Sequence, residues 1–124
     1  MEGTDVLHLV VPVEHAYLDV KLKFAVAKPP EIGASVFKYA IILALKQLHG
    51  EVGAAIPVDV LRFDLESRRA YLRVPATELV KVWSSLTMFS SYNNRPCRFL
   101  VYKVSHSLAA LSVSSQAIQH VVLP

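Results

Sequence analysis

The stretch "ELVKVWSSLTMFSSYNNRPCRFLVYKVS", residues 78–105, passes from an apolar helical stripe through a polar turn into a basic strand. Apolar residues recur at helical spacing in its first part, which predicts an amphipathic helix. The run "SSYNNRP" ends that helix, and both alternating sets of side chains in "CRFLVYKVS" are largely apolar, which is typical of a strand covered on both faces. The predicted buried face of the helix consists of Leu79, Val80, Val82, Trp83, Leu86 and Phe89, opposite Lys81, Ser84, Ser85 and Met88.

The segments before this stretch predict three more strands and one more helix. "AYLDVKLKFAVA" at 16–27 alternates between apolar and polar positions, as a half-buried strand does. "KPPEIGAS" interrupts it, and Ser35 is expected to cap a helix that ends at Gly50. "PVDVLRFD" and "AYLRV" flank the polar turn "LESRR" and predict a hairpin, after which Thr77 is expected to cap the second helix.

The resulting order, β-α-β-β-α-β, predicts an α+β fold of the split βαβ type, ferredoxin-like and similar to RNA recognition motifs. In this arrangement two helices pack on one face of an antiparallel sheet. The 124 residues fit a single domain, 1–124, with its core at about 16–105 and a weakly helical C-terminal tail at 106–124. The other sheet face is expected to show Lys21, Lys23, Tyr71 and Arg73, with part of the last strand.

Composition narrows the class of protein. The chain is 53% hydrophobic with four glycines, so apolar surface is expected to remain for partners. The longest apolar run, 39–45, is far shorter than the roughly 20 residues of a membrane span, and no membrane partner is expected. Acidic residues near the start lead us to expect a non-secreted protein. Cys97 is the single cysteine, so an internal disulfide cannot form and a reducing compartment suits the chain.

Charge is distributed unevenly along the chain. Residues 1–66 hold six Lys/Arg and nine Asp/Glu, whereas residues 67–124 hold seven and one. Clustered basic charge attracts phosphates, which indicates a polyanionic partner for the second half. An ordinary solvated surface is the alternative interpretation.

Searches for catalytic or cofactor motifs find none. The third strand, "RRAYLRV", carries one aromatic and lacks the glycines of an RNA recognition motif, so contacts to an RNA backbone are favoured over base stacking on Tyr71. "GEVG" at 50–53 is interpreted as a helix end rather than a phosphate loop. Asp64 and Glu66 fit a solvated turn better than a metal site, and Cys97 fits a small packed side chain better than a nucleophile. No catalytic residue, metal or cofactor is therefore predicted.

Three segments resemble a known family: "GEVGAAIPVDVL" (50–61), "LVKVWSSLT" (79–87) and "SLAALS" (107–112). They resemble the fourteen-kilodalton protein-subunit family of eukaryotic ribonuclease P, over about residues 17–112. The sister subunits of that superfamily usually begin with a basic strand, whereas "HAYLDVKLKF" here follows an acidic leader, which favours the fourteen-kilodalton branch. The resemblance implies a noncatalytic subunit of a ribonucleoprotein whose RNA removes the 5′ leader of precursor tRNA. Whether it is shared with the related ribonuclease for mitochondrial RNA processing stays open at this point.

The resemblance also implies partners and a location. The expected partners are ribonuclease P RNA, a barrel-shaped protein subunit and the sister small subunit, in the nucleus and nucleolus. The predicted RNA contacts are Arg68, Arg69, Arg73, Arg95, Arg98 and Lys103, and the predicted protein contacts are Ile42, Leu45, Phe99 and Val101. Two alternatives stay open: a ferredoxin-like regulatory module that binds a small molecule and dimerises, and an enzyme using Cys97 or the Asp64/Glu66 pair.

Overall fold

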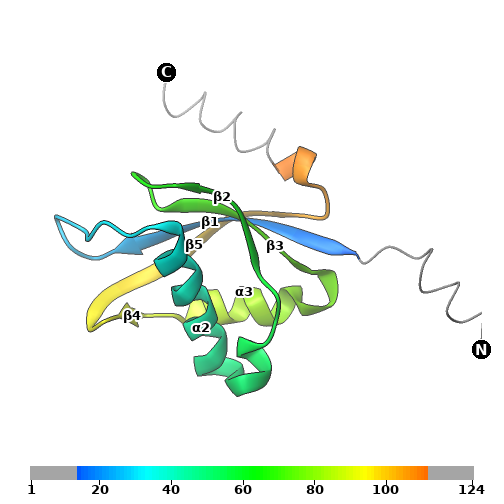
Figure 1. Ribbon diagram of the computed structural model, residues 1–124, viewed down its shortest axis with the longest axis horizontal. Helices are drawn as coiled ribbons and strands as arrows, with labels where there is room; N and C mark the ends of the chain where they lie inside the picture. Colours follow the sequence, from blue (N-terminus) through cyan, green and yellow to red (C-terminus); the bar gives the residue numbers. More distant parts are fainter. Residues whose placement is uncertain (1–13, 112–124) are drawn as a thin grey trace, which may run out of the picture.

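The computed structural model describes residues 14–111, which fold as a sheet with two helices on one side (Figure 1). The sheet has five strands in the order β2-β3-β1-β5-β4, and each neighbouring pair is antiparallel. The predicted α+β split βαβ fold is confirmed, with the short β4 as an addition. The elements are β1 (His15–Phe24), α2 (Ala34–Ala54), β2 (Asp59–Asp64), β3 (Arg69–Pro75), the 3-10 turn η1 (Ala76–Glu78), α3 (Leu79–Met88), β4 (Ser91–Tyr92) and β5 (Arg95–Ser105).

A tight turn explains the additional strand. Asn93 and Asn94 have φ of 50° and 62°. Two consecutive left-handed residues make the type I′ turn that joins two antiparallel strands, and asparagine tolerates this conformation better than most residues do. Tyr92 consequently pairs with Arg95 across the hairpin. The sequence analysis recognised turn formers here but not the strand that they create.

Two glycines shape the C-terminal end of α2. Gly50 adopts φ 67° and kinks the helix, a conformation that costs other residues energy. The chain then turns back closely enough that a Cβ on Gly53 would lie 2.4 Å from the carbonyl oxygen of Leu45. The prediction that "GEVG" ends a helix is confirmed. The predicted side-chain caps are not: Gly33 and Glu78 occupy the N-cap positions, and neither helix start has a side-chain cap bond.

The core lies between the sheet and the helices. The ring centroid of Phe37 on α2 lies 5.2 Å from that of Phe63 and 5.8 Å from that of Phe99. The ring centroids of Phe99 and Phe89 are 5.3 Å apart. Aromatic clusters of this kind add favourable edge and tilted contacts to the burial of apolar area. They join α2, β2, β5 and the end of α3 into one interior.

The orientation of α3 differs from the prediction. Trp83 and Val80, predicted to be buried, are 44% and 78% exposed, whereas Ser85, predicted to be exposed, is 1% exposed. Ser85 satisfies its hydroxyl by donating to the carbonyl of Lys81 at 2.7 Å, so its burial leaves no polar group unpaired. Ser85 also lines a groove with Ala44 of α2, where small side chains suit the close approach of two helices.

The described end of the chain lies on the opposite side of the sheet from the helices (Figure 1). Ser107 begins a helical turn there, because its hydroxyl accepts a bond from the N–H of Ala110 at 3.4 Å. Leu111 is fully buried although it is outside the core cluster. The weakly helical character predicted for the tail holds up to residue 111, and the rest of that prediction lies outside the described residues, as does the acidic leader.

Candidate nucleic-acid interface

The sheet face opposite α2 and α3, called the open face below, carries mainly basic and tyrosine side chains. Burial alternates along β1 and β3, so that Ala16, Leu18, Leu72 and Val74 point into the core and their neighbours point away. The open face is formed by Tyr17, Asp19, Lys21 and Lys23 of β1, Asp59, Arg62 and Asp64 of β2, Arg69, Tyr71 and Arg73 of β3, and Arg98, Leu100, Tyr102 and Lys103 of β5. The expected exposure of Lys21, Lys23, Tyr71 and Arg73 on this face is confirmed.

A buried ion pair lies at the centre of the open face. Arg69 donates two hydrogen bonds of 2.7 Å to the two carboxylate oxygens of Asp19, whose side chain is fully buried. The bonds to Asp19 raise the pKa of Arg69, while its partial burial acts in the opposite direction. The same guanidinium carbon lies 4.2 Å from the ring centroid of Tyr102. Arg69 is therefore held rigidly by an acid and an aromatic ring, and it organises the face.

Tyr102 reaches this position through a bulge. The β1–β5 register passes from Asp19 opposite Lys103 to Val20 opposite Val101, so Tyr102 has no partner of its own. The extra residue shifts the alternation by one. Val104 consequently packs on the core side with Val101, not with Leu100 and Tyr102 as the simple alternation predicted.

Two further arginines predicted to bind RNA are engaged inside the chain. Arg73 donates to Asp59 at 2.9 and 3.1 Å, in a half-exposed pair. Arg68, at the β2–β3 turn with φ 55°, donates to the carbonyl oxygens of Leu22 at 3.2 Å and Glu66 at 3.3 Å. These bonds leave the guanidinium groups positively charged, so the residues still contribute to the potential of the surface.

The remaining predicted cations lie in two places. Arg98 is exposed on the open face near the end of β1, and Lys103 is partly buried opposite Asp19. Arg95 has the opposite strand parity from Arg98 and lines a hollow with Tyr92, Glu31 and the start of α2, on the helix side. Five of the six predicted residues thus belong to the open face or its adjoining turn, and Arg95 does not.

The sequence analysis missed part of this surface. Three further cations of the open face were not predicted to bind RNA: Lys21, Lys23 and Arg62. They lie in residues 1–66, whose net charge is negative, and the prediction rested on the net positive charge of residues 67–124. Their strand positions, on the polar side of an alternating pattern, could have revealed them. The three carboxylates of the face are all engaged: Asp19 with Arg69, Asp59 with Arg73, and Asp64 with the N–H of Ser67 at 2.9 Å. The face is therefore net positive.

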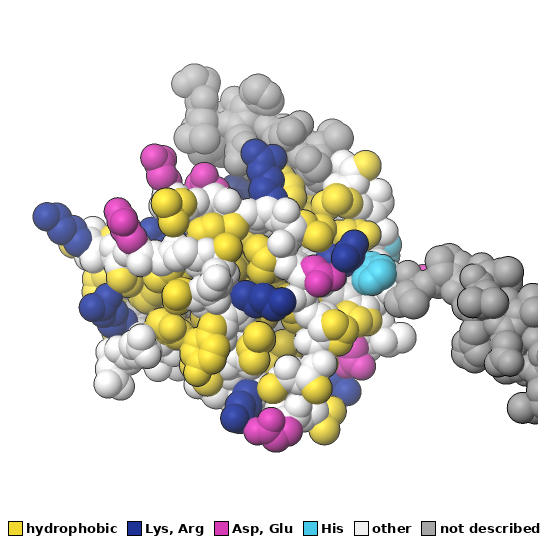
Figure 2. Space-filling view, in the orientation of Figure 1, with side chains coloured by type: hydrophobic (Ala, Val, Ile, Leu, Met, Phe, Trp, Pro, Cys, Tyr) yellow, Lys and Arg dark blue, Asp and Glu magenta, His cyan; other side chains and the backbone are white. Residues whose placement is uncertain are grey.

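The predicted protein contacts lie mostly in the interior. Leu45 and Phe99 are buried in the core and Val101 packs against it, so these three cannot present an apolar surface without opening the domain. Ile42 is half-buried. The apolar side chains that the helical side does expose are Tyr39, Leu48 and Val52 on α2 and Val80, Trp83 and Met88 on α3. Figure 2 shows hydrophobic side chains gathered over the region that α2 occupies in Figure 1.

The residues considered for catalysis have structural roles. Cys97 is buried, and desolvation raises the pKa of its thiol, which opposes formation of a nucleophilic thiolate. Asp64 accepts bonds from the backbone and hydroxyl of Ser67 in the β2–β3 turn, and these bonds lower the pKa of its carboxyl. Within residues 14–111, no three potential metal ligands gather, and no helix is long and apolar enough to cross a membrane.

The fold and the surface together define a ferredoxin-like binding module, with a basic sheet face and an apolar helical face. Residues 14–89 match the family described as "Ribonucleases P/MRP protein subunit Pop8". "Ribonuclease P protein subunit p14" of Mus musculus is 45% identical over 107 residues, 85% of each chain, and that of Homo sapiens is 42% identical over 105 residues, 85% of this chain and 84% of the relative. The chain belongs to this family of ribonuclease P/MRP protein subunits.

A solved structure has the same fold. A chain in the "Cryo-EM structure of yeast Ribonuclease MRP" superposes with a TM-score of 0.66 at 17% identity, covering 92% of this chain and 98% of that one. At this identity the likeness concerns the fold alone.

Proposed function

We propose that this protein is a noncatalytic subunit of the ribonuclease P ribonucleoprotein, in which it braces the RNA and neighbouring proteins while the RNA removes 5′ leaders from precursor tRNA. The observation that carries the proposal is identity of 42–45% to ribonuclease P subunits over 85% of the chain. Similarity over almost the whole domain, rather than at a short motif, supports a shared role in the complex. The related ribonuclease MRP is a second particle that the protein would enter.

The open face is the proposed RNA-binding surface. Its cations outnumber its carboxylates, and each carboxylate is already engaged within the chain. Such a surface attracts the phosphate backbone, and its contacts position RNA without reading sequence. Arg69, Arg73, Arg98 and Lys103 belong to it, with Arg68 at its edge. Arg95 lies on the helix side and would contact RNA only where the RNA passes the β4–β5 hairpin.

The helical side is the proposed protein-binding surface. Trp83, Val80 and Met88 on α3 and Leu48 on α2 are exposed apolar side chains, and a large exposed aromatic residue is typical of an interface anchor. We assign this side to the barrel-shaped subunit and to the sister small subunit. Of the residues predicted for this role, Ile42 on α2 is half-buried, whereas Leu45, Phe99 and Val101 belong to the interior.

The proposal is tested by purifying the tagged protein from cells. The eluate is expected to contain ribonuclease P RNA and the partner subunits, to cleave 5′ leaders from precursor tRNA, and to lose that activity on treatment with a nuclease that degrades the RNA. Fluorescence of the tagged protein is expected in the nucleus and nucleolus. An eluate that lacks both the RNA and the partner subunits would defeat the proposal, as would a purified chain that cleaves precursor tRNA without RNA.

A further inference from the structure

One end of the open face places two cations directly opposite each other. The antiparallel register pairs Lys23 of β1 with Arg98 of β5, and both side chains are exposed. Residues in such register have Cα atoms about 5 Å apart and side chains on the same face. Like charges in this position repel each other and weaken the pairing of the strands. Within residues 14–111, neither cation takes part in an ion pair.

This pair departs from the pattern of the rest of the face. Elsewhere, carboxylates lie opposite cations: Asp59 opposite Arg73, Asp64 opposite Arg69, and Asp19 opposite Lys103. Lys21 also lies opposite Arg69, but there Asp19 neutralises the arginine. Only at Lys23 and Arg98 do the described strands bring two cations into register without an acid, and a bound anion would remove the resulting repulsion.

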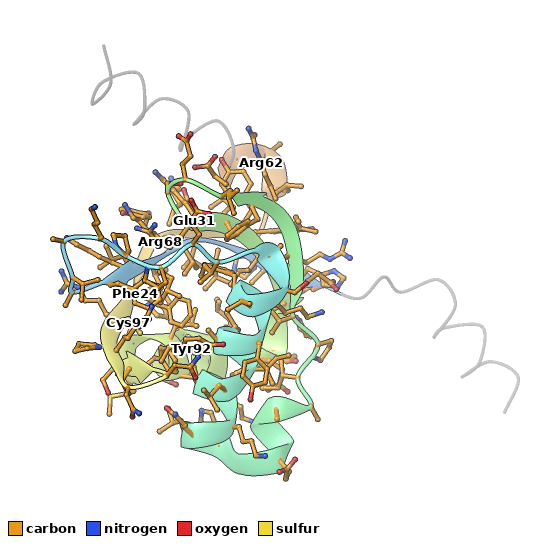
Figure 3. All side chains as sticks on the ribbon, turned by 60° about the vertical axis from the view of Figure 1, so that its left-hand side comes forward. Phe24, Glu31, Arg62, Arg68, Tyr92 and Cys97 are labelled. Atoms are coloured by element: carbon orange, nitrogen blue, oxygen red, sulfur yellow. The ribbon has the colours of Figure 1, made fainter. Side chains whose placement is uncertain are left out.

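A hollow accompanies the two cations. Lys23 and Arg98 line a cavity of about 270 Å³ together with Phe24, Pro96 and Cys97. Phe24 and Cys97 pair with each other across the two strands and belong to the core side of the sheet, the side opposite the two cations, and Figure 3 shows them close together at this end of the sheet, away from Arg62. The hollow therefore adjoins the end of the two strands, and the two cations that border it attract an anion such as a phosphodiester. Lys21, two residues before Lys23 in β1, lies on the same face and adds a third cation to this end of the open face.

We propose that Lys23 and Arg98 form a clamp for one backbone phosphodiester of single-stranded RNA. The inference rests on the proposed function and locates a specific contact within the RNA-binding surface. Lys23 is the new element, because it lies in the acidic half of the sequence and comes beside Arg98 only through the β1–β5 pairing. The clamp recognises phosphate charge, so it binds without preference for base identity.

The first test measures how the affinity of the full chain for a twelve-nucleotide oligouridylate changes with salt. Loss of one phosphate contact reduces the slope of log affinity against log salt by about 1. The double variant Lys23→Gln/Arg98→Gln is therefore expected to bind roughly 20-fold more weakly at 50 mM salt and roughly 5-fold more weakly at 200 mM. The matched control, Lys38→Gln/Lys46→Gln on α2, removes the same charge from the other side of the sheet.

The second test measures the melting temperature without RNA at low salt. Either single variant, Lys23→Gln or Arg98→Gln, is expected to melt at a higher temperature than the wild type, and the double variant to gain little more, because one neutral partner already removes the repulsion. The gain should disappear in high salt, where surface charges are screened. A role confined to the fold predicts the reverse, namely loss of stability together with loss of binding.

Three outcomes would overturn the clamp: an unchanged salt slope in the double variant, an equal loss in the control, or no binding of oligouridylate by the wild type. The proposed function is tested apart from it, by recovery of ribonuclease P RNA with the tagged wild type. Recovery of that RNA with an unchanged salt slope would reject the clamp and leave the proposed function standing. Failure of the wild type to recover both the RNA and the partner subunits would reject the proposed function itself.

Discussion

Neutralising Asp19 should destabilise the domain strongly, although the residue lies on the face that would meet RNA. Asp19→Asn keeps the shape of the side chain but removes the charge that compensates Arg69. The wild-type carboxylate is fully buried and accepts two bonds of 2.7 Å, and the side chain of Arg69 is only 18% exposed. Breaking a buried pair typically costs 3–5 kcal/mol. Because Arg69 reaches solvent, we expect the lower end, about 3 kcal/mol.

Urea unfolding followed by circular dichroism measures this cost. At a slope of about 2 kcal/mol per molar urea, the midpoint should fall by about 1.5 M, and the melting temperature by about 10 °C. The matched control is Asp59→Asn, which breaks the same type of pair with Arg73 on a neighbouring strand. There both side chains are half-exposed, at 48% and 40%, so the loss should stay below about 1 kcal/mol.

Equal costs for Asp19→Asn and Asp59→Asn would refute the reasoning, since they would show that burial does not separate the two pairs. The double variant Asp19→Asn/Arg69→Gln gives a second check. If the two residues stabilise the domain through each other, its cost should be less than the sum of the single costs, by about 1 kcal/mol or more. Additive costs would mean that the two residues act independently.

Three more predictions follow from the fold. Gly53→Ala should lower the free energy of unfolding by about 3 kcal/mol, because its Cβ would be forced against the carbonyl of Leu45. Gly50→Ala should lower it by about 1 kcal/mol, because of the positive φ at Gly50. A larger loss of stability in urea unfolding for Gly50→Ala than for Gly53→Ala would contradict this. Trp83→Ala should change the stability of the free chain by less than about 1 kcal/mol but reduce recovery of partner subunits about tenfold or more, and recovery at the wild-type level would remove Trp83 from the interface. Because burial raises the pKa of the Cys97 thiol, the stability that the neutral thiol contributes is fully present below the pKa that the thiol has in the unfolded chain, and it is lost as the pH rises through the higher pKa of the folded state. The urea midpoint of the wild type is therefore expected to fall more steeply at alkaline pH than that of Cys97→Ala, and equal slopes would disprove this.

The order of the elements could be predicted because it depends on local patterns. Strict alternation in β1 and turn residues between the strands determine where strands begin and end, and the βαββαβ order then selects the sheet topology. The polar side of β1 also placed Lys21 and Lys23 correctly. The basic character of the open face was therefore accessible from the sequence, even where its residues were not assigned to RNA.

Other features depend on contacts that periodicity does not encode. The apolar stripe of α3 contains both Trp83 and Val82, and its spacing does not show which of the two faces the core. In the structure, α3 approaches α2 with Ser85 near Ala44, so that Val82 is buried and Trp83 is exposed. The bulge at Tyr102 changes which side chains share a face, yet the sequence around it reads as a regular strand. The sequence also does not show which arginines pair with an acid inside the protein. The bond between Arg69 and Asp19, which are 50 residues apart in the chain, becomes visible only in the folded sheet.

Crosslinking of protein to RNA in the purified ribonucleoprotein, read out by mass spectrometry, tests the central claim most directly. The account predicts nucleotide adducts on the open face, at Lys21, Lys23 and Lys103, while Lys38 and Lys46 on α2 stay unmodified. Adducts confined to the helical side, with the open face free of RNA, would contradict the assignment of the two surfaces.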